Sequence, residues 1–165
     1  MVHGEYATSE NCTSDGLKLL RNLAEKSDME AQLELAGLLN SDISKIVKDL
    51  ARPQPDDAEA FRWYMAVATA HPDNTTAAIW LARFYDEGLS ISKNLERAFH
   101  WYLVAATLGD RQGIREAARM LAKGEGTTKN VTEAINLLGK LRDDEGAQLQ
   151  LAAVYIFYDA DGGSI

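Results

Sequence analysis

The chain has 165 residues, 46% of them hydrophobic and 25% charged, which suits a folded domain with a core. Its formal net charge of −8 argues against general nucleic-acid binding, and no apolar run approaches the roughly 18 residues of a membrane span. Cys12 is the only cysteine, so an internal disulfide is excluded. No signal peptide is visible, so we expect a periplasmic location if one was removed and a cytoplasmic location otherwise.

The charge is unevenly distributed along the chain. Residues 1–60 carry 12 acids and 6 bases, residues 61–142 carry 8 acids and 11 bases, and residues 143–165 carry 5 acids and no base. The middle of the chain is therefore mildly basic and both ends are acidic. We expect such acidic ends to favour a basic surface on a partner.

In chain order, we predict a flexible N-terminus over 1–13, a helical repeat domain over 14–158 and a flexible C-terminus over 159–165. The first helix is expected at about 14–26 and the last at about 145–158. Between them the helices are expected to alternate in pairs, whose first and second members we call A and B. Gly88 and Gly124 are predicted to end A helices, and Asn94 and Asn130 to cap B helices.

Two phrases in the sequence recur at a nearly fixed period. Residues 77–88 read AAIWLARFYDEG and residues 113–124 read GIREAARMLAKG, 36 residues later. Residues 58–68 and 96–106 share a second phrase, with an offset of 38. Periods in this range are typical of stacked helical pairs, so we predict an all-α fold, a right-handed α-solenoid of antiparallel helix pairs.

The A helices share a small residue at position 1, Leu or Ala at position 5, a small residue at position 6 and a large residue at position 9. Position 1 is occupied by Ala31, Ala77, Gly113 and Ala147. Because i, i+4 and i+8 lie on one helix face, we predict that positions 1, 5, 6 and 9 form the core face. In the B helices, Trp63 and Trp101 occupy repeated positions and are expected in the core.

The first complete repeat is eight residues longer than the others. The extra residues lie within Asn40–Asp57, where Ile46, Val47 and Leu50 form an apolar set. We consider two roles for this insertion, an extension of the first A helix that caps the solenoid and a contact site for a partner.

These motifs resemble the Sel-1-like repeat family, a relative of tetratricopeptide repeats. Residues 98–106, AFHWYLVAA, match the second-helix motif of the family almost completely, and residues 85–88, YDEG, match the end of its first helix. The resemblance covers about residues 16–155. It implies a scaffold for protein–protein contacts, common in bacterial envelope and host-interaction proteins, and a similarity to immunity proteins that neutralise type VI secretion lipases.

The sequence provides no arrangement of residues that indicates catalysis. His3, His71 and His100 lack metal-ligand spacing, and neither a phosphate-binding loop nor a nucleophile elbow is present. We therefore predict a protein that is not an enzyme and has no cofactor and no metal site.

The A-helix positions outside the core face are predicted to line a partner-binding groove. They include Glu34, Ile79, Trp80, Arg83 and Glu87. Trp80 beside Arg83 has the composition of a binding hot spot, although packing against a neighbouring repeat is the alternative.

A row of cations recurs every four residues from Arg111 to Lys123 and includes Arg115 and Arg119. Like charges at this spacing destabilise a helix by about 0.2–0.5 kcal/mol per pair. In one interpretation, acids from adjacent turns neutralise the row, with candidates Asp110, Glu116, Asp144 and Glu145. In the other, the row binds acidic groups of a partner, so that reversing Arg115 and Arg119 to Glu weakens binding without unfolding.

The predicted function is that of a protein–protein interaction module of undetermined oligomeric state. The most concrete form is a bacterial immunity protein that occludes a secreted toxic effector, such as a type VI secretion lipase. The alternative is a non-catalytic scaffold or regulator of the envelope or of host interaction.

Overall fold

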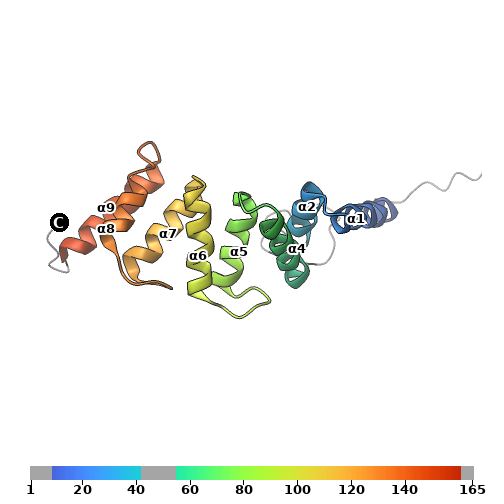
Figure 1. Ribbon diagram of the computed structural model, residues 1–165, viewed down its shortest axis with the longest axis horizontal. Coiled ribbons are helices and arrows are strands. Elements are labelled where there is room, and N and C mark those ends of the chain that lie inside the picture. Colours follow the sequence, from blue (N-terminus) through green and yellow to red (C-terminus); the bar gives the residue numbers. More distant parts are fainter. Residues whose placement is uncertain (1–8, 42–54, 161–165) are drawn as a thin grey trace, which may run out of the picture. The chain divides into compact units, whose positions relative to one another are not determined.

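The computed structural model describes the backbone of residues 9–41 and 55–160, and side chains within 15–41 and 55–156. Throughout these ranges the regular elements are all α-helices (Figure 1), which confirms the predicted all-α class. The chain divides into two compact units, Met1–Pro72 and Asp73–Ile165. The prediction of one continuous repeat domain over 14–158 stays a prediction.

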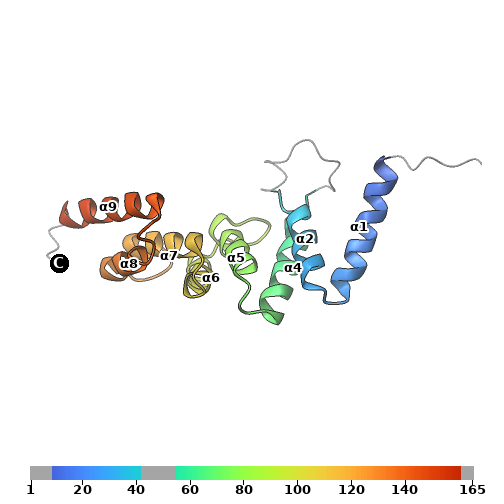
Figure 2. The ribbon, with the colours of Figure 1, turned by 90° about the horizontal axis from the view of Figure 1, so that it is seen from above.

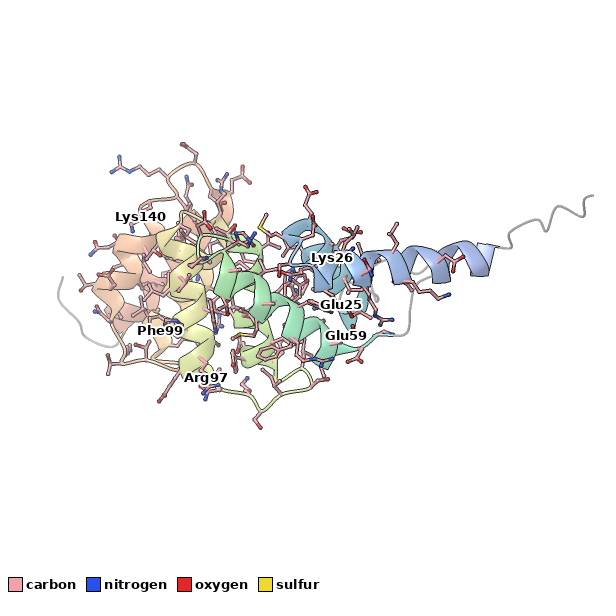
Figure 3. The ribbon with its side chains drawn as sticks, turned by 45° about the vertical axis from the view of Figure 1, so that its right-hand side comes forward. Glu25, Lys26, Glu59, Arg97, Phe99 and Lys140 are labelled. Carbon is pink, nitrogen blue, oxygen red and sulfur yellow. The ribbon has the colours of Figure 1, made fainter. Side chains whose placement is uncertain are left out.

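The first unit contains three helices, α1 (Ser9–Glu25), α2 (Met29–Leu39) and α4 (Asp57–Ala70). The A helix α2 packs against the B helices α1 and α4 (Figure 2). Helix α1 begins at Ser9, earlier than the predicted start at 14, while residues 1–8 lie outside the described part. An ion pair of 2.9 Å links Arg21 of α1 to Glu59 of α4. Figure 3 labels Glu59, together with Glu25 at the end of α1.

The second unit contains five helices, α5 (Thr75–Glu87), α6 (Leu95–Thr107), α7 (Arg111–Lys123), α8 (Val131–Leu138) and α9 (Glu145–Ala160). Each helix packs against the next, and the A helices α7 and α9 also touch each other. Helix α9 runs two residues past its predicted end at 158, and the remainder of the predicted flexible C-terminus, 161–165, lies outside the described part.

The A helices bury more positions than the sequence predicts. Positions 1, 5 and 6 are buried in α2, α5 and α7, as expected, and position 9 is at most 9% exposed. In α5 and α7, positions 2 and 8 are buried as well, as Ile114 and Met120 show in α7. The reason is that α7 lies between α6 and α8, so it buries two faces rather than one.

The helix caps follow the prediction. Asn94 and Asn130 cap the B helices α6 and α8, and their side chains accept backbone N–H bonds at 2.9 and 3.0 Å. Gly88 and Gly124 end α5 and α7 with φ of 76°, in the left-handed region that a glycine adopts at little cost.

One backbone hydrogen bond recurs in all three A-to-B connections. The carbonyl at position 9 of the A helix accepts from the N–H of the cap residue of the B helix, at 2.8–2.9 Å. The pairs are Leu39 with Asp56, Tyr85 with Asn94, and Leu121 with Asn130. In the first repeat the partners are eight residues further apart in sequence, so the insertion leaves this bond intact.

The two ends of the insertion are also tied together. The backbone N–H and hydroxyl of Ser41 donate to the carboxylate of Asp57 at 2.8 and 2.7 Å. Ile46, Val47 and Leu50 lie outside the described residues, so both roles considered for the insertion stay predictions.

The expectation that Trp63 and Trp101 lie in the core is wrong in part. Both indoles are half-buried, whereas the neighbouring Tyr64 and Tyr102 are 1% and 3% exposed. Trp63 donates to Glu59 at 3.3 Å, and Trp101 meets the ring of His100 edge-on. The tyrosine of each Trp-Tyr pair, rather than the tryptophan, therefore occupies the core position.

Candidate protein-binding surface

Trp80, Arg83 and Glu87 follow one another along α5 at positions 4, 7 and 11. The guanidinium of Arg83 lies over the Trp80 ring, 4.7 Å from its centroid, and pairs with Glu87 at 3.1 Å. Trp80 is half-buried, and the side chains of Arg83 and Glu87 are 28% and 43% exposed. The indole is thus held in place by a cation while part of it remains available for contact.

The structure corrects the assignment of Ile79 to this surface. Ile79 is only 8% exposed, because α5 buries more of its circumference than the repeated core positions indicate. Glu34 is exposed, as predicted, but it lies on α2 in the first compact unit. The predicted site residues therefore divide between two units, with Trp80, Arg83 and Glu87 together on α5.

The first two cations of the basic row on α7, Arg111 and Arg115, lie close to a carboxylate at the start of α9. Asp144 lies 3.1 Å from Arg111 and 3.9 Å from Arg115. The same carboxylate caps α9 by accepting the backbone N–H of Ala147 at 2.8 Å. This hydrogen bond, assisted by the two arginines, lowers the pKa of Asp144 below its ordinary value of 3.8.

The second half of the row forms a denser cluster around Arg119. Its guanidinium pairs with Glu116 at 2.8 Å, with Asp86 of α5 at 3.3 Å, and with Glu125. Lys123 lies 3.7 Å from Glu125. The side chain of Arg119 is 27% exposed and therefore partly desolvated, and three carboxylates share its charge.

Tyr102 of α6 lies beneath this cluster. Burial raises the pKa of its hydroxyl, and the nearby carboxylates of Glu116 and Asp86 raise it further. The phenol therefore stays neutral and serves as a packing residue under the charged surface.

The interpretation in which neighbouring acids neutralise the row describes the geometry. Two of the four proposed acids, Glu116 and Asp144, pair with it, whereas Asp110 caps α7 and accepts from the N–H of Gly113. Asp86 and Glu125 were not anticipated. Position 10 of one A helix meets position 7 of the next, which is a register that appears only when the helices stack.

On α5 and α7, in the loops that follow them and at the start of α9, six cations and five carboxylates take part in ion pairs, so this network is nearly neutral. The cations are Arg83, Lys93, Arg111, Arg115, Arg119 and Lys123, and the carboxylates are Asp86, Glu87, Glu116, Glu125 and Asp144. Arg111 and Lys123 remain 60% and 59% exposed. Binding of a partner by the row stays a prediction, and these two are its most accessible members.

Within the described residues, no group of three or more His, Cys, Asp or Glu side chains is arranged to hold a metal ion. In the same part of the chain, no helix has the length and apolar character needed to cross a bilayer.

The Sel1 repeat model matches three segments of the chain, residues 30–64, 75–110 and 113–142, and each segment covers most or all of one A helix and all or part of the B helix that follows. No curated protein sequence matches this chain. Sel1 repeat proteins are generally scaffolds for protein–protein interaction.

Solved structures of similar fold are also Sel1 or SLR repeat proteins. A Sel1 repeat protein from Oxalobacter formigenes is 25% identical, with a TM-score of 0.69 over 87% of this chain and 53% of its own. A protective antigen present in uropathogenic Escherichia coli strains is 23% identical, with a TM-score of 0.75 over 92% of this chain and 30% of its own.

Cysteine-rich protein B of Helicobacter pylori is 19% identical, with a TM-score of 0.59 over 85% of this chain and 95% of its own. This chain thus spans about half of the first relative and less than a third of the second. The α-solenoid fold predicted from the repeats is confirmed, and the chain belongs to the Sel1 repeat family.

Proposed function

We propose that this chain acts without catalysis, by binding another protein at the surface formed by α5 and α7. The observation that carries the proposal is the half-buried Trp80, fixed under Arg83 at 4.7 Å, with the exposed Glu87 paired to the same arginine. Tryptophan and arginine are enriched in binding hot spots, where a rigid aromatic ring meets a partner at low entropic cost.

The near-neutral charge of the surface bears on the kind of partner. Each cation already has a carboxylate nearby, so long-range attraction of an acidic partner is weak. A partner would instead exchange ion pairs with the surface, which favours specificity over raw affinity. This character suits a dedicated protein partner rather than a general polyanion.

The most concrete form of the proposal is an immunity protein that occludes a secreted toxic effector, such as a type VI secretion lipase. Two features support it: the binding surface described above, and the acidic segments 1–60 and 143–165, which are suited to covering a basic active site. In this form the chain works in the periplasm after removal of a leader, and otherwise in the cytoplasm. The second candidate is a scaffold of the envelope or of host interaction that uses the same surface.

Co-purification with the product of a neighbouring gene tests the immunity form. Tight binding that abolishes a toxic activity of that product supports immunity. A neighbouring product that has no toxic activity, or that does not bind, removes the immunity form and leaves the scaffold.

The surface itself is tested with two matched substitutions measured against the same partner. Arg83→Ala removes the guanidinium from the face of the Trp80 ring, and we expect it to weaken binding roughly tenfold, or about 1.4 kcal/mol. The control is Arg97→Ala on α6, a residue that Figure 3 labels, whose guanidinium lies 5.4 Å from the centroid of the Tyr85 ring. Both changes remove an arginine from an aromatic face, but we place only Arg83 in the interface.

The basic row needs a different test from the one that the sequence suggests. Reversing Arg119 to Glu would place a fourth carboxylate among Glu116, Asp86 and Glu125 and would disturb the fold. Replacing Arg111 and Lys123 with Ala removes the most exposed cations instead. Unchanged affinity in that double variant, together with unchanged affinity in Arg83→Ala, would refute the proposed surface.

A further inference from the structure

The last A helix, α9, exposes residues that the other A helices bury. At position 6, Ala152 is exposed, whereas Ala82 is fully buried. At position 9, Tyr155 is 40% exposed, whereas Tyr85 is 9% exposed. The repeat pattern on α9 therefore presents a core face that lacks part of its packing.

Two large aliphatic side chains extend this exposed face. Leu149 at position 3 is 76% exposed and Ile156 at position 10 is 68% exposed. In the preceding repeats these two positions are where one A helix meets the next. Arg115 at position 3 reaches Asp144, and Asp86 at position 10 reaches Arg119. Helix α9 thus has apolar side chains where another A helix would follow.

The first helix, α1, shows the complementary deficiency for a B helix. Its motif residues are Gly16, Leu19 and Leu20, of which Gly16 is exposed and Leu19 is 63% exposed. The equivalent residues of α8, which has A helices on both sides, are 0–4% exposed: Ala134, Leu137 and Leu138. Helix α1 packs against α2 and has no A helix before it among the described residues.

We propose that α9 of one molecule packs against α1 and α2 of a second copy, head to tail. Every interior A helix of the second unit is followed by a B helix and then by another A helix. In the second copy, α1 and α2 are a B helix and an A helix in that order, so each molecule provides the packing that the other lacks. The contact is heterologous, because a different end of each molecule takes part, so it joins molecules head to tail rather than in a symmetric dimer.

The charges at the two ends set the strength of this association. The segments that contain the two ends are both acidic, with a net charge of −6 over residues 1–60 and −5 over residues 143–165, so we expect their net charges to oppose association. Added salt screens exposed charges, with a Debye length of about 10 Å at 0.1 M and about 3 Å at 1 M. We therefore expect weak association that strengthens as salt is added, the reverse of an interface held by ion pairs.

Light scattering and sedimentation of the full chain test the proposal. The mass of one chain is 18.2 kDa, and we expect the average mass to rise above this value as the protein approaches roughly 1 mM. Leu149→Glu with Ile156→Glu blocks the α9 end, and Leu19→Glu blocks the α1 end. Each variant alone should stay at the mass of one chain, and circular dichroism checks that each is folded.

Mixing the two blocked variants provides the decisive measurement. Each variant keeps one intact end, so an equimolar mixture should form a complex that approaches twice the mass of one chain and grows no further. Leu108→Glu is the control, because Leu108, the residue that follows α6, is 42% exposed but lies at neither end. It should associate like the unmodified chain.

Three results would overturn the proposal. They are a constant mass of 18.2 kDa for the unmodified chain at every concentration and salt, a blocked mixture that remains monomeric, and association that survives in the α9 variant. A symmetric α9-to-α9 dimer would be recognised because Leu19→Glu would leave it intact. None of these results depends on the surface of α5 and α7, so this proposal and the proposed function fail separately.

Discussion

Replacing Gly113 with Ala provides a test of how closely the helices of the second unit pack. Gly113 occupies position 1 of α7, where the other A helices have Ala31, Ala77 and Ala147. The repeat pattern by itself predicts that Ala stabilises the helix by about 1 kcal/mol, because Gly is a poor helix former. The structure predicts the opposite sign.

The magnitude follows from the distance between α6 and α7. A Cβ at Gly113 would lie 2.8 Å from the backbone nitrogen of Ala106, and 2.7 and 2.9 Å from the Cβ and carbonyl carbon of Ala105. Carbon atoms in contact normally lie about 3.5–4.0 Å apart, and the backbone of α6 can give way only by moving the helix. Such overpacking costs about 1–3 kcal/mol, which offsets or exceeds the gain in helix propensity of about 1 kcal/mol, so we expect a net destabilisation of up to about 2 kcal/mol.

Urea denaturation followed by far-UV circular dichroism measures the change, with Gly146→Ala as the matched control. Both glycines lie in helices of the second unit, and a Cβ at Gly146 would lie 2.8 Å from Nη1 of Arg115. That atom is the end of a flexible side chain and can swing away, so we expect Gly146→Ala to be at least as stable as the parent. If Gly113→Ala is as stable as the parent while the control behaves as expected, the close approach of α6 and α7 is wrong.

Two further predictions concern the ion pairs of α7. Arg119→Met removes the cation that hydrogen-bonds three carboxylates in a partly buried position, and we expect it to destabilise the second unit by about 1–2 kcal/mol in urea denaturation. Lys123→Met, with one partner at 3.7 Å, should cost less than about 0.5 kcal/mol. Equal costs for the two would contradict the central position of Arg119. Asp144→Asn keeps a capping side chain but removes the charge. The folded-state pKa of Asp144 lies below 3.8, so the contribution of its carboxylate to stability is present above that pH and is lost as the pH falls through the folded-state pKa. The urea midpoints of parent and variant should therefore differ at pH 7 and converge in acid.

The elements and their caps were largely predictable because they depend on local sequence. Asn94 and Gly88 occupy positions whose backbone demands are met within a few residues, and both lie where the sequence places them. The eight-residue insertion was also located correctly, since the bond between Leu39 and Asp56 joins its flanks as its counterparts do in the other repeats.

The candidate surface was harder to predict because it depends on how helices far apart in sequence meet. Ile79 was assigned to the surface from its place outside the repeated core positions, but α5 buries it. The row from Arg111 to Lys123 is correctly placed along one face of a single helix. Its partners Asp86 and Asp144 come from the A helices on either side, 33 residues away from the arginines that they bind at 3.3 and 3.1 Å.

The repeated residues and the cap residues were enough to establish an all-α stack of helix pairs, because a helix and its ends are specified by contacts within a few residues. Which tryptophan face stays exposed, and whether the arginines are paired, depend on distances between helices that are separate along the chain. The repeat brings Asp86 and Arg119 within 3.3 Å of each other only when α5 and α7 stack. Tertiary packing thus turned a predicted basic stripe into a nearly neutral network, with Trp80 half-buried beside it.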